Sequence, residues 1–340
     1  MDNKDKIYSK YRLVRCFEYI IVVLAVFLFL PVTAFADTVL MGEARKVLSA
    51  YGGQLWPGFF GKDFPIVIVD HKHDKFYCAR KLPVGFTLFS IDADTNCRID
   101  IREAGQFSTN IQATLPFAGA GPVAVIGAYG IIESNSTSWI ATLLHENFHQ
   151  YQMNWSGYYS GLTALDLAGD DDSGMWALNY PFAYDDQQVV AIIRSNSLDL
   201  VAILTEPDKN IRKKLALQYA AKRAGRLSTL TAADRRYMEF QLWQEGMARY
   251  TELALAEFAA SGTHTSLGVD HDFAALAANL RTRILQTLIE GKISQHQRVY
   301  FYSLGAAEAL VLDEIDQSWR ESYFSNGLSM AGFFSDAINN

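Results

Sequence analysis

The sequence of 340 residues is poor in cysteine and proline and has no excess of basic charge. It contains 3 Cys, 8 Pro and 23 Gly, which excludes a collagen-like or low-complexity protein. Its 30 Lys and Arg residues are outnumbered by 37 Asp and Glu residues, so it lacks the basic footprint of a nucleic-acid-binding protein. The hydrophobic share is 50%, which excludes a disordered chain and is enough for a sizeable core.

The N-terminal apolar run is shorter than a membrane span requires. Residues 20–30 form an uninterrupted apolar run of 11 residues, whereas a helical span needs about 20. Basic residues precede this run, and Ala34, Phe35 and Ala36 follow it as a small-x-small pattern. We therefore expect residues 1–36 to be a signal peptide cleaved after Ala36. The product would be an exported, acidic protein with no stable membrane span; an uncleaved signal anchor is the alternative.

Cleavage would leave two cysteines, Cys78 and Cys97. In an oxidising compartment, a lone pair of cysteines tends to form a disulfide. We therefore expect a Cys78–Cys97 bridge, with two free buried thiols as the alternative.

The remaining sequence changes character near residue 135. Before this point, short β-branched or alternating segments predict strands at 65–70, 85–91, 98–102 and 122–128, after a first helix at 39–51. After it, the periodicity is helical, beginning with a helix at 139–155 that Ser134, Ser136 or Thr137 could cap. Further helices are expected at 186–204, 208–226, 231–260, 271–290 and 295–318. The expected fold class is α+β, with a small α/β lobe at 37–135 and a helical catalytic lobe at 136–340.

The first expected helix of the second lobe contains the pattern H-E-x-x-H, formed by His145, Glu146 and His149. Residues four apart lie one turn apart on the same face of a helix, so both imidazoles can bind one metal ion. Glu146 lies beside that face, where its carboxylate can reach a water on the metal. The alternative is a pair of core histidines, but an unpaired buried carboxylate between them would be costly. The pattern therefore predicts a zinc site with Glu146 as general base.

A zinc site of this kind needs a third ligand, and Glu245 is the best candidate. It begins the stretch Glu-Gly-Met-Ala-Arg-Tyr, which ends at Tyr250. H-E-x-x-H followed by E-G-x-A-x-Y resembles the gluzincin metallopeptidases, and this resemblance implies that Glu245 completes the zinc site. Gly246 would let the two helices approach closely. Asp166 is an alternative third ligand, and a surface position for Glu245 is the other reading.

A later tyrosine extends the same resemblance. Residues 302–305 match the Y-x-x-G pattern of gluzincin aminopeptidases, whose Tyr stabilises the oxyanion. The resemblance gives this role to Tyr302, with Tyr300 as the fallback, and a core Tyr is the alternative. The sequence also departs from the family, because Arg249 stands where many gluzincins have an acid that orients a zinc-bound His. Glu252, on the same helix face as Glu245, is the expected substitute.

Several other features allow a functional or a purely structural reading. Asp170, Asp171 and Asp172 lack the spaced ligands of a calcium loop and read as a solvated acidic loop. His264 and His271 are expected at the surface. The aromatic stretch 174–184 could wall a substrate cleft or pack on neighbouring helices. The strand at 122–128 is expected to be a sheet edge that pairs with an extended peptide.

The combined expectation is an exported zinc metallopeptidase, with His145, His149 and Glu245 as ligands and Glu146 and Tyr302 in catalysis. Its partner would be a peptide or protein substrate, and one Zn²⁺ per chain its cofactor. Two other readings remain open. A non-catalytic zinc-binding protein would close the site with a fourth ligand, such as His271. A non-peptidase zinc amide hydrolase would lack a peptide-accepting strand edge.

Overall fold

The computed structural model describes residues 32–60, 64–92, 96–117, 119–171, 173–262 and 271–339. Most of the expected signal segment, residues 1–31, therefore lies outside the described residues. Its last five residues, Val32 to Ala36, begin helix α2 (Val32–Val47), so the expected cleavage point lies within this helix.

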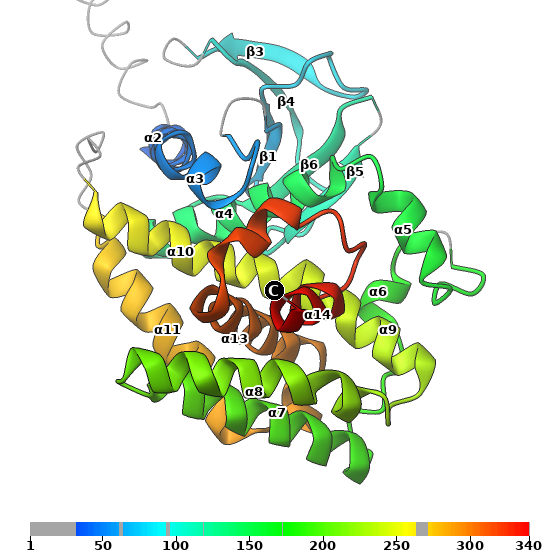
Figure 1. The fold of residues 1–340 in the computed structure, drawn as a ribbon. Helices are drawn as coiled ribbons and strands as arrows, with labels where there is room; N and C mark the ends of the chain where they lie inside the picture. Colours follow the sequence, from blue (N-terminus) through cyan, green and yellow to red (C-terminus); the bar gives the residue numbers. More distant parts are fainter. Residues whose placement is uncertain are drawn as a thin grey trace, which may run out of the picture.

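Six strands form one mixed sheet in the N-terminal part of the chain (Figure 1). Its order is β3-β4-β2-β1-β6-β5, and only β1 and β6 pair in parallel. The strands are β1 (Ile66–Val69), β2 (His73–Tyr77), β3 (Thr87–Ile91), β4 (Arg98–Glu103), β5 (Gln112–Phe117) and β6 (Gly121–Gly127).

The sequence patterns predicted four of these strands but missed β2 and β5. Strand β2 carries Asp74 and Lys75, which are rare in buried strands. Both are nevertheless buried, because Asp74 pairs with Arg102 at 2.7 Å and Lys75 with Asp70 at 2.9 Å. Strand β5 lies at a sheet edge, so its polar residues are tolerated there.

Helices cover one face of the sheet and, with the loops that join them, form the C-terminal part of the described chain. Around the sheet these are α2, η1 (Leu48–Gly52), α3 (Gly53–Leu55) and α4 (Ser136–Met153). They are followed by α5 (Tyr158–Ala164), α6 (Trp176–Asn179), α7 (Gln187–Thr205), α8 (Lys209–Leu227), α9 (Ala232–Gln241), η2 (Leu242–Gly246) and α10 (Met247–Ser261). The last are α11 (Phe273–Glu290), α12 (Ile293–His296), η3 (Gln297–Val299), α13 (Tyr300–Ile315), η4 (Gln317–Ser322) and α14 (Ala331–Asn339). The fold class is thus α+β, as expected.

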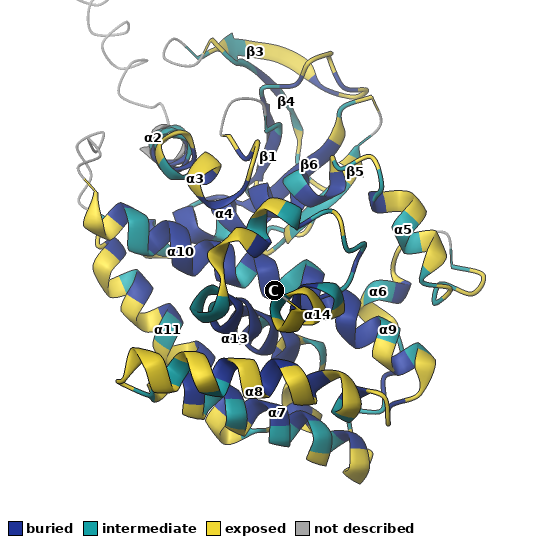
Figure 2. Ribbon diagram, viewed as in Figure 1, coloured by how far each residue is buried: buried dark blue, intermediate teal, exposed yellow. Residues whose placement is uncertain are grey.

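The main apolar core joins the sheet to the helices. Ile66, Ile68 and Ile126 on one sheet face belong to the same buried cluster as Phe148 of α4 and Leu304 of α13. A second, smaller cluster covers the other sheet face. Figure 2 shows the resulting pattern, in which α4, α10 and α13 are largely buried and α7 and α8 are exposed on their outer sides. The division into two lobes at residue 135 stays a prediction.

Helix α7 has the length and composition that would also allow a membrane span. A core helix meets the same criteria, and α7 packs against α8, α11 and α13. Its buried residues, including Ile193 and Leu200, belong to the main core. We therefore describe α7 as part of the helical bundle.

Two glycines bring the η2–α10 segment and α13 into backbone contact. A Cβ atom on Gly246 would lie 2.5 Å from the Cα of Gly305, and one on Gly305 would lie 2.7 Å from the Cα of Gly246. Both distances are far below van der Waals contact, so only glycine fits at this crossing. The sequence predicted that Gly246 would bring its helix close to the helix of His145 and His149; the close approach is instead to Gly305 of α13.

The crossing predicts the effect of a single methyl group. Gly to Ala inside a helix usually stabilises a protein by about 0.5–1 kcal/mol. For Gly246→Ala we expect instead a loss of about 1–3 kcal/mol in the free energy of unfolding, because the methyl group overpacks the contact. The matched control is Gly225→Ala in α8, where a Cβ would meet no atom within 4 Å. Urea denaturation should show opposite signs for the two variants; equal effects would contradict the close crossing.

Candidate metal centre

Helix α4 carries the two histidines. It begins at Ser136, and its N-cap is Asn135, whose side chain accepts a hydrogen bond from the backbone N–H of Ser138 at 2.9 Å. The hydroxyl caps suggested by the sequence are therefore wrong, although the helix itself is confirmed. The side chain of Asn135 provides the N-cap hydrogen bond in place of a hydroxyl from Ser134 or Thr137.

Three potential ligand atoms converge between α4 and η2. The Nε2 atoms of His145 and His149 lie 3.0 Å apart, and the Oε2 atom of Glu245 lies 3.5 Å from the first and 3.3 Å from the second. A zinc ion with tetrahedral bonds of about 2.0–2.1 Å holds its ligand atoms roughly 3.3 Å apart. These three residues form the only group of this kind among the described residues, and their spacing fits a metal ion.

The carboxylate of Glu245 gives a second indication of a missing cation. Its Oε2 atom is buried and accepts no hydrogen bond, although it faces two imidazole nitrogens. A buried acceptor without a donor is rare in a native protein and calls for an explanation. A metal ion between the three atoms would satisfy it.

The charges of the metal-free site point the same way. Burial lowers the pKa of His145, but the neighbouring carboxylates of Glu245 and Glu252 have the larger, opposite effect and raise it to about 10. Burial raises the pKa of Glu245, but the nearby imidazoles of His149 and His145 hold it well below its usual range. Without a metal ion, the site therefore retains a proton that an ion would displace.

Each histidine is oriented through its other ring nitrogen. Nδ1 of His145 is hydrogen-bonded to Glu252, and Glu252 accepts a further hydrogen bond from Arg249 at 2.6 Å. This geometry leaves the Nε2 lone pair of His145 for a metal, as in carboxylate–histidine–zinc arrangements. Glu252 thus has the outer position that the sequence suggested, and Arg249 supports it.

His149 is oriented by Gln152, which the sequence analysis missed. The Gln152 amide nitrogen donates to the backbone oxygen of Trp243 at 3.0 Å, so its Oε1 atom must accept. That oxygen lies 2.7 Å from Nδ1 of His149. The amide nitrogen of Gln244 also lies near Nδ1, at the longer distance of 3.1 Å. With Nδ1 donating to Gln152, Nε2 is available to a metal.

Glu245 lies in a π-helical turn between α9 and α10. The single long helix expected at 231–260 is thus interrupted by η2 (Leu242–Gly246). Such π-turns occur often at functional sites because they redirect one side chain. Arg298 of η3 donates to the other carboxylate oxygen of Glu245, Oε1, at 2.9 Å. This contact, also missed from the sequence, leaves Oε2 to face the histidines.

Glu146 and Tyr302 lie beside the three ligand atoms. The buried Glu146 accepts a hydrogen bond from the Thr114 hydroxyl of β5 at 2.8 Å. The ring of Tyr302 stacks on that of His145 with centroids 5.9 Å apart, and its hydroxyl accepts from Arg298 at 2.9 Å. Burial and the charge of Glu245 raise the pKa of Tyr302 well above its usual range, so its hydroxyl stays protonated.

The fallback tyrosine points elsewhere. The hydroxyl of the buried Tyr300 lies 2.8 Å from that of Ser197 in α7. Of the two tyrosines, only Tyr302 lines the cavity at the metal group.

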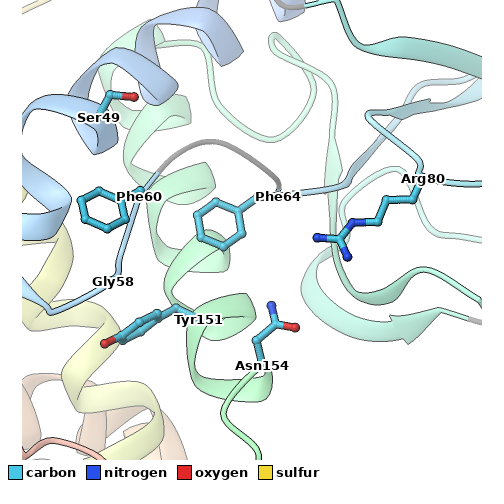
Figure 3. A pocket seen from close by; sticks show the side chains of 7 residues that line it. All are labelled: Ser49, Gly58, Phe60, Phe64, Arg80, Tyr151 and Asn154. Atoms are coloured by element: carbon cyan, nitrogen blue, oxygen red, sulfur yellow. The ribbon is translucent and has the colours of Figure 1, made fainter.

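A polar cavity of about 300 Å³ opens beside this group. Its lining includes His145, Glu146, Glu252, Arg249, Tyr302 and, from β5, Gln112. A cavity of about 560 Å³ lies at the C-terminal end of α4, lined by Ser49, Gly58, Phe60, Phe64, Arg80, Tyr151 and Asn154 (Figure 3). Although larger, it contains no acid, base or nucleophile suited to hydrolysis, so the smaller cavity is the candidate active site.

Other candidate ligands lie away from the site. Asp166 is exposed and does not belong to the ligand group. Asp171 caps the turn before α6 by accepting from the backbone N–H groups of Ser173 and Trp176, and Asp172 lies outside the described residues. His264 also lies outside them. His271 contacts Ser136 at the start of α4 and is not part of the ligand group.

Two expectations about substrate contacts need revision. The strand expected at a sheet edge, β6, lies between β1 and β5, so it cannot accept a peptide; the edge on this side is β5. The aromatic stretch 174–184 packs on helices, since Tyr180 stacks on Tyr237 and Phe182 contacts Phe301. It contributes no residue to the cavity at the metal group.

The cysteines form the expected bridge between Cys78 and Cys97. No protein-family model, curated protein or solved structure matches this chain, so the functional assignment depends on the geometry of the site itself.

The raised pKa of His145 predicts how metal binding depends on pH. Because the metal-free site retains a proton up to about pH 10, an ion must displace that proton at neutral pH. The apparent zinc affinity should then rise about tenfold per pH unit between pH 6 and 8. Titration against a competing chelator measures it, with Glu245→Ala as a variant that lacks one ligand. A flat pH profile, or wild-type affinity in Glu245→Ala, would contradict the site.

Proposed function

We propose that the protein is a zinc-dependent metallopeptidase of gluzincin type. The observation that carries this proposal is the convergence of His145, His149 and Glu245 at ligand distances, next to a cavity that His145 and Glu146 both line. Zinc is favoured over calcium or magnesium because two of the three donors are imidazole nitrogens.

The three ligands would hold zinc through His145 Nε2, His149 Nε2 and Glu245 Oε2. The group contains three candidate ligands among the described residues, as in catalytic sites that keep one position open for water. When bound there, zinc would lower the pKa of a coordinated water and polarise a carbonyl group. The absence of a fourth described ligand weighs against a closed, structural site.

Glu146 is proposed as the general base and acid. The Thr114 hydroxyl holds its carboxylate at the cavity, where it can take a proton from the attacking water and pass it to the leaving amine. Tyr302, which is protonated at neutral pH, can donate a hydrogen bond to the carbonyl oxygen as negative charge develops there.

A peptide is the favoured substrate because a free strand edge adjoins the cavity. Strand β5 pairs only with β6 among the described strands, and its first residue, Gln112, lines the cavity. An extended peptide could pair with this edge and place a backbone carbonyl near Glu146. This edge favours a peptidase over an enzyme for other amides.

Export is part of the same proposal. The Cys78–Cys97 disulfide is typical of proteins that fold in an oxidising compartment. Cleavage of residues 1–36 as a signal peptide stays a prediction from the sequence.

The experiment that tests the function is peptide hydrolysis by the zinc-loaded protein and by its Glu146→Gln variant. We expect Glu146→Gln to retain about one zinc per chain and to lose roughly 10²–10⁴-fold in kcat. The measurements are metal analysis and a peptide-library assay. Equal rates for the variant and the wild type would exclude Glu146 as the base, and an inactive wild type that holds zinc would favour the binding-protein reading.

Arg298 should act as a positioning residue for this site. Its Nη1 atom donates to both Glu245 and Tyr302 at 2.9 Å, so Arg298→Ala removes one group that orients a ligand and a proposed donor. We expect zinc affinity about 10–100-fold weaker, with a smaller loss in Arg298→Lys. The matched control is Arg281→Ala, which breaks an exposed ion pair with Glu257. Wild-type zinc affinity and kcat in Arg298→Ala would rule out this role.

A further inference from the structure

The segment of residues 80–91, which we name the apolar protrusion, exposes an unusual amount of hydrophobic surface. It comprises the loop before β3 and β3 itself, at the rim of the sheet farthest from α7 and α8 (Figures 1 and 2). Its exposed apolar side chains are Leu82 (51%), Val84 (94%), Leu88 (57%), Phe89 (61%) and Ile91 (62%). Single exposed apolar residues are common, but five within ten residues mark an interaction surface.

The strand within the protrusion lies at the edge of the sheet. β3 is the last strand of the sheet, and it pairs only with β4 among the described strands. Proteins usually protect such an edge with inward-pointing charges, proline or a covering element. Here the register shifts between Leu88 and Ser90, so Phe89 is an extra residue without a partner on β4. This bulge interrupts the edge and makes it a poor template for another strand.

The charge of the protrusion is opposite to that of the whole chain. Arg80 and Lys81 are its only charged residues, whereas the chain has a net charge of −7. Neither forms an ion pair with a described residue. The segment therefore combines exposed apolar side chains with two cations, Lys81 and Arg80, of which Arg80 also lines the cavity at the end of α4 (Figure 3). Apolar side chains beside cationic ones favour the interface of an anionic bilayer.

The base of the protrusion is fixed to the body of the protein. The Cys78–Cys97 disulfide joins the residues just before the loop to the start of β4. Phe86 is buried in the second apolar cluster, where the guanidinium of Arg102 lies 4.5 Å from its ring centroid. The exposed residues thus project from an anchored support.

We propose that the apolar protrusion inserts into the interface of a membrane that contains anionic phospholipid. Pairing with a second copy of the chain fits less well, because Val84 lies in the loop outside β3 and the bulge disrupts the edge. Insertion into lipid buries the loop and the strand together, while Arg80 and Lys81 contact phosphate groups. The proposal does not depend on the peptidase function.

The first test places a fluorescent probe in the protrusion of the full chain. The V84W variant is mixed with vesicles of phosphatidylglycerol and brominated phosphatidylcholine, whose bromine quenches tryptophan in the acyl region. Of the six native tryptophans, Trp155 is half-buried and the other five are buried: Trp56, Trp139, Trp176, Trp243 and Trp319. All six are present in both variants and contribute the same background. The matched control is I211W, at a position 49% exposed on the distant α8.

We expect the added fluorescence of V84W to be quenched and that of I211W to be unchanged. This comparison separates insertion of the protrusion from tethering through the N-terminal apolar run, which would leave both probes outside the bilayer. Absence of quenching in V84W, or equal quenching in both variants, overturns the proposal.

The second test measures what each part of the protrusion contributes. In co-sedimentation with vesicles, the affinity of the V84S/F89S variant for vesicles should be more than tenfold lower than that of the wild type. The R80Q/K81Q variant should lose about fivefold per charge on anionic vesicles and nothing on neutral ones. The L198S/I211S variant, which changes exposed residues elsewhere, is the control. Unchanged vesicle binding in V84S/F89S, or concentration-dependent dimers that this variant abolishes, would overturn membrane insertion.

Discussion

The candidate site depends on the backbone contact between Gly246 and Gly305. Each glycine lies close in sequence to a side chain of the site, since Glu245 directly precedes the first and Tyr302 lies three residues before the second. A Cβ atom at either glycine would meet the backbone of the other helix and so displace the segment that carries Glu245. The geometry of the metal group therefore depends on glycine at both positions of the helix crossing.

Around that crossing, the protein buries several charges and gives nearly all of them a partner. An isolated charge in a protein interior is costly, so such groups need compensating charges or hydrogen bonds. Arg249 compensates Glu252, and Glu252 in turn orients His145. Arg249 stands at the position where many gluzincins have an acid, and Glu252, three residues later on the same helix, supplies the carboxylate that orients His145. Within the ligand group, Oε2 of Glu245 accepts no hydrogen bond, and the proposed metal ion would be its partner.

The sequence predicted the parts of this site that depend on local spacing. His145, Glu146 and His149 follow from the period of one helix, and the fold class follows from the change from alternating to helical patterns. Glu245 and Tyr302 needed a resemblance to a known family, because their distance in sequence gives no information on contact. Gln152 and Arg298 could not be found, since their roles arise from hydrogen bonds across the fold. The peptide-accepting edge was wrongly assigned to β6. The position of a strand in its sheet depends on which strands pair with it, and the sequence of β6 alone does not show that β1 and β5 lie on either side.

Gln152 connects the two segments that carry the candidate metal ligands. Its side chain connects α4 to the backbone at Trp243 and also to Tyr323, near the C-terminal end of the chain. These bonds hold the two ligand-bearing segments together without any ion. Folding would then not require the proposed metal ion, which the finished fold could take up in a later step.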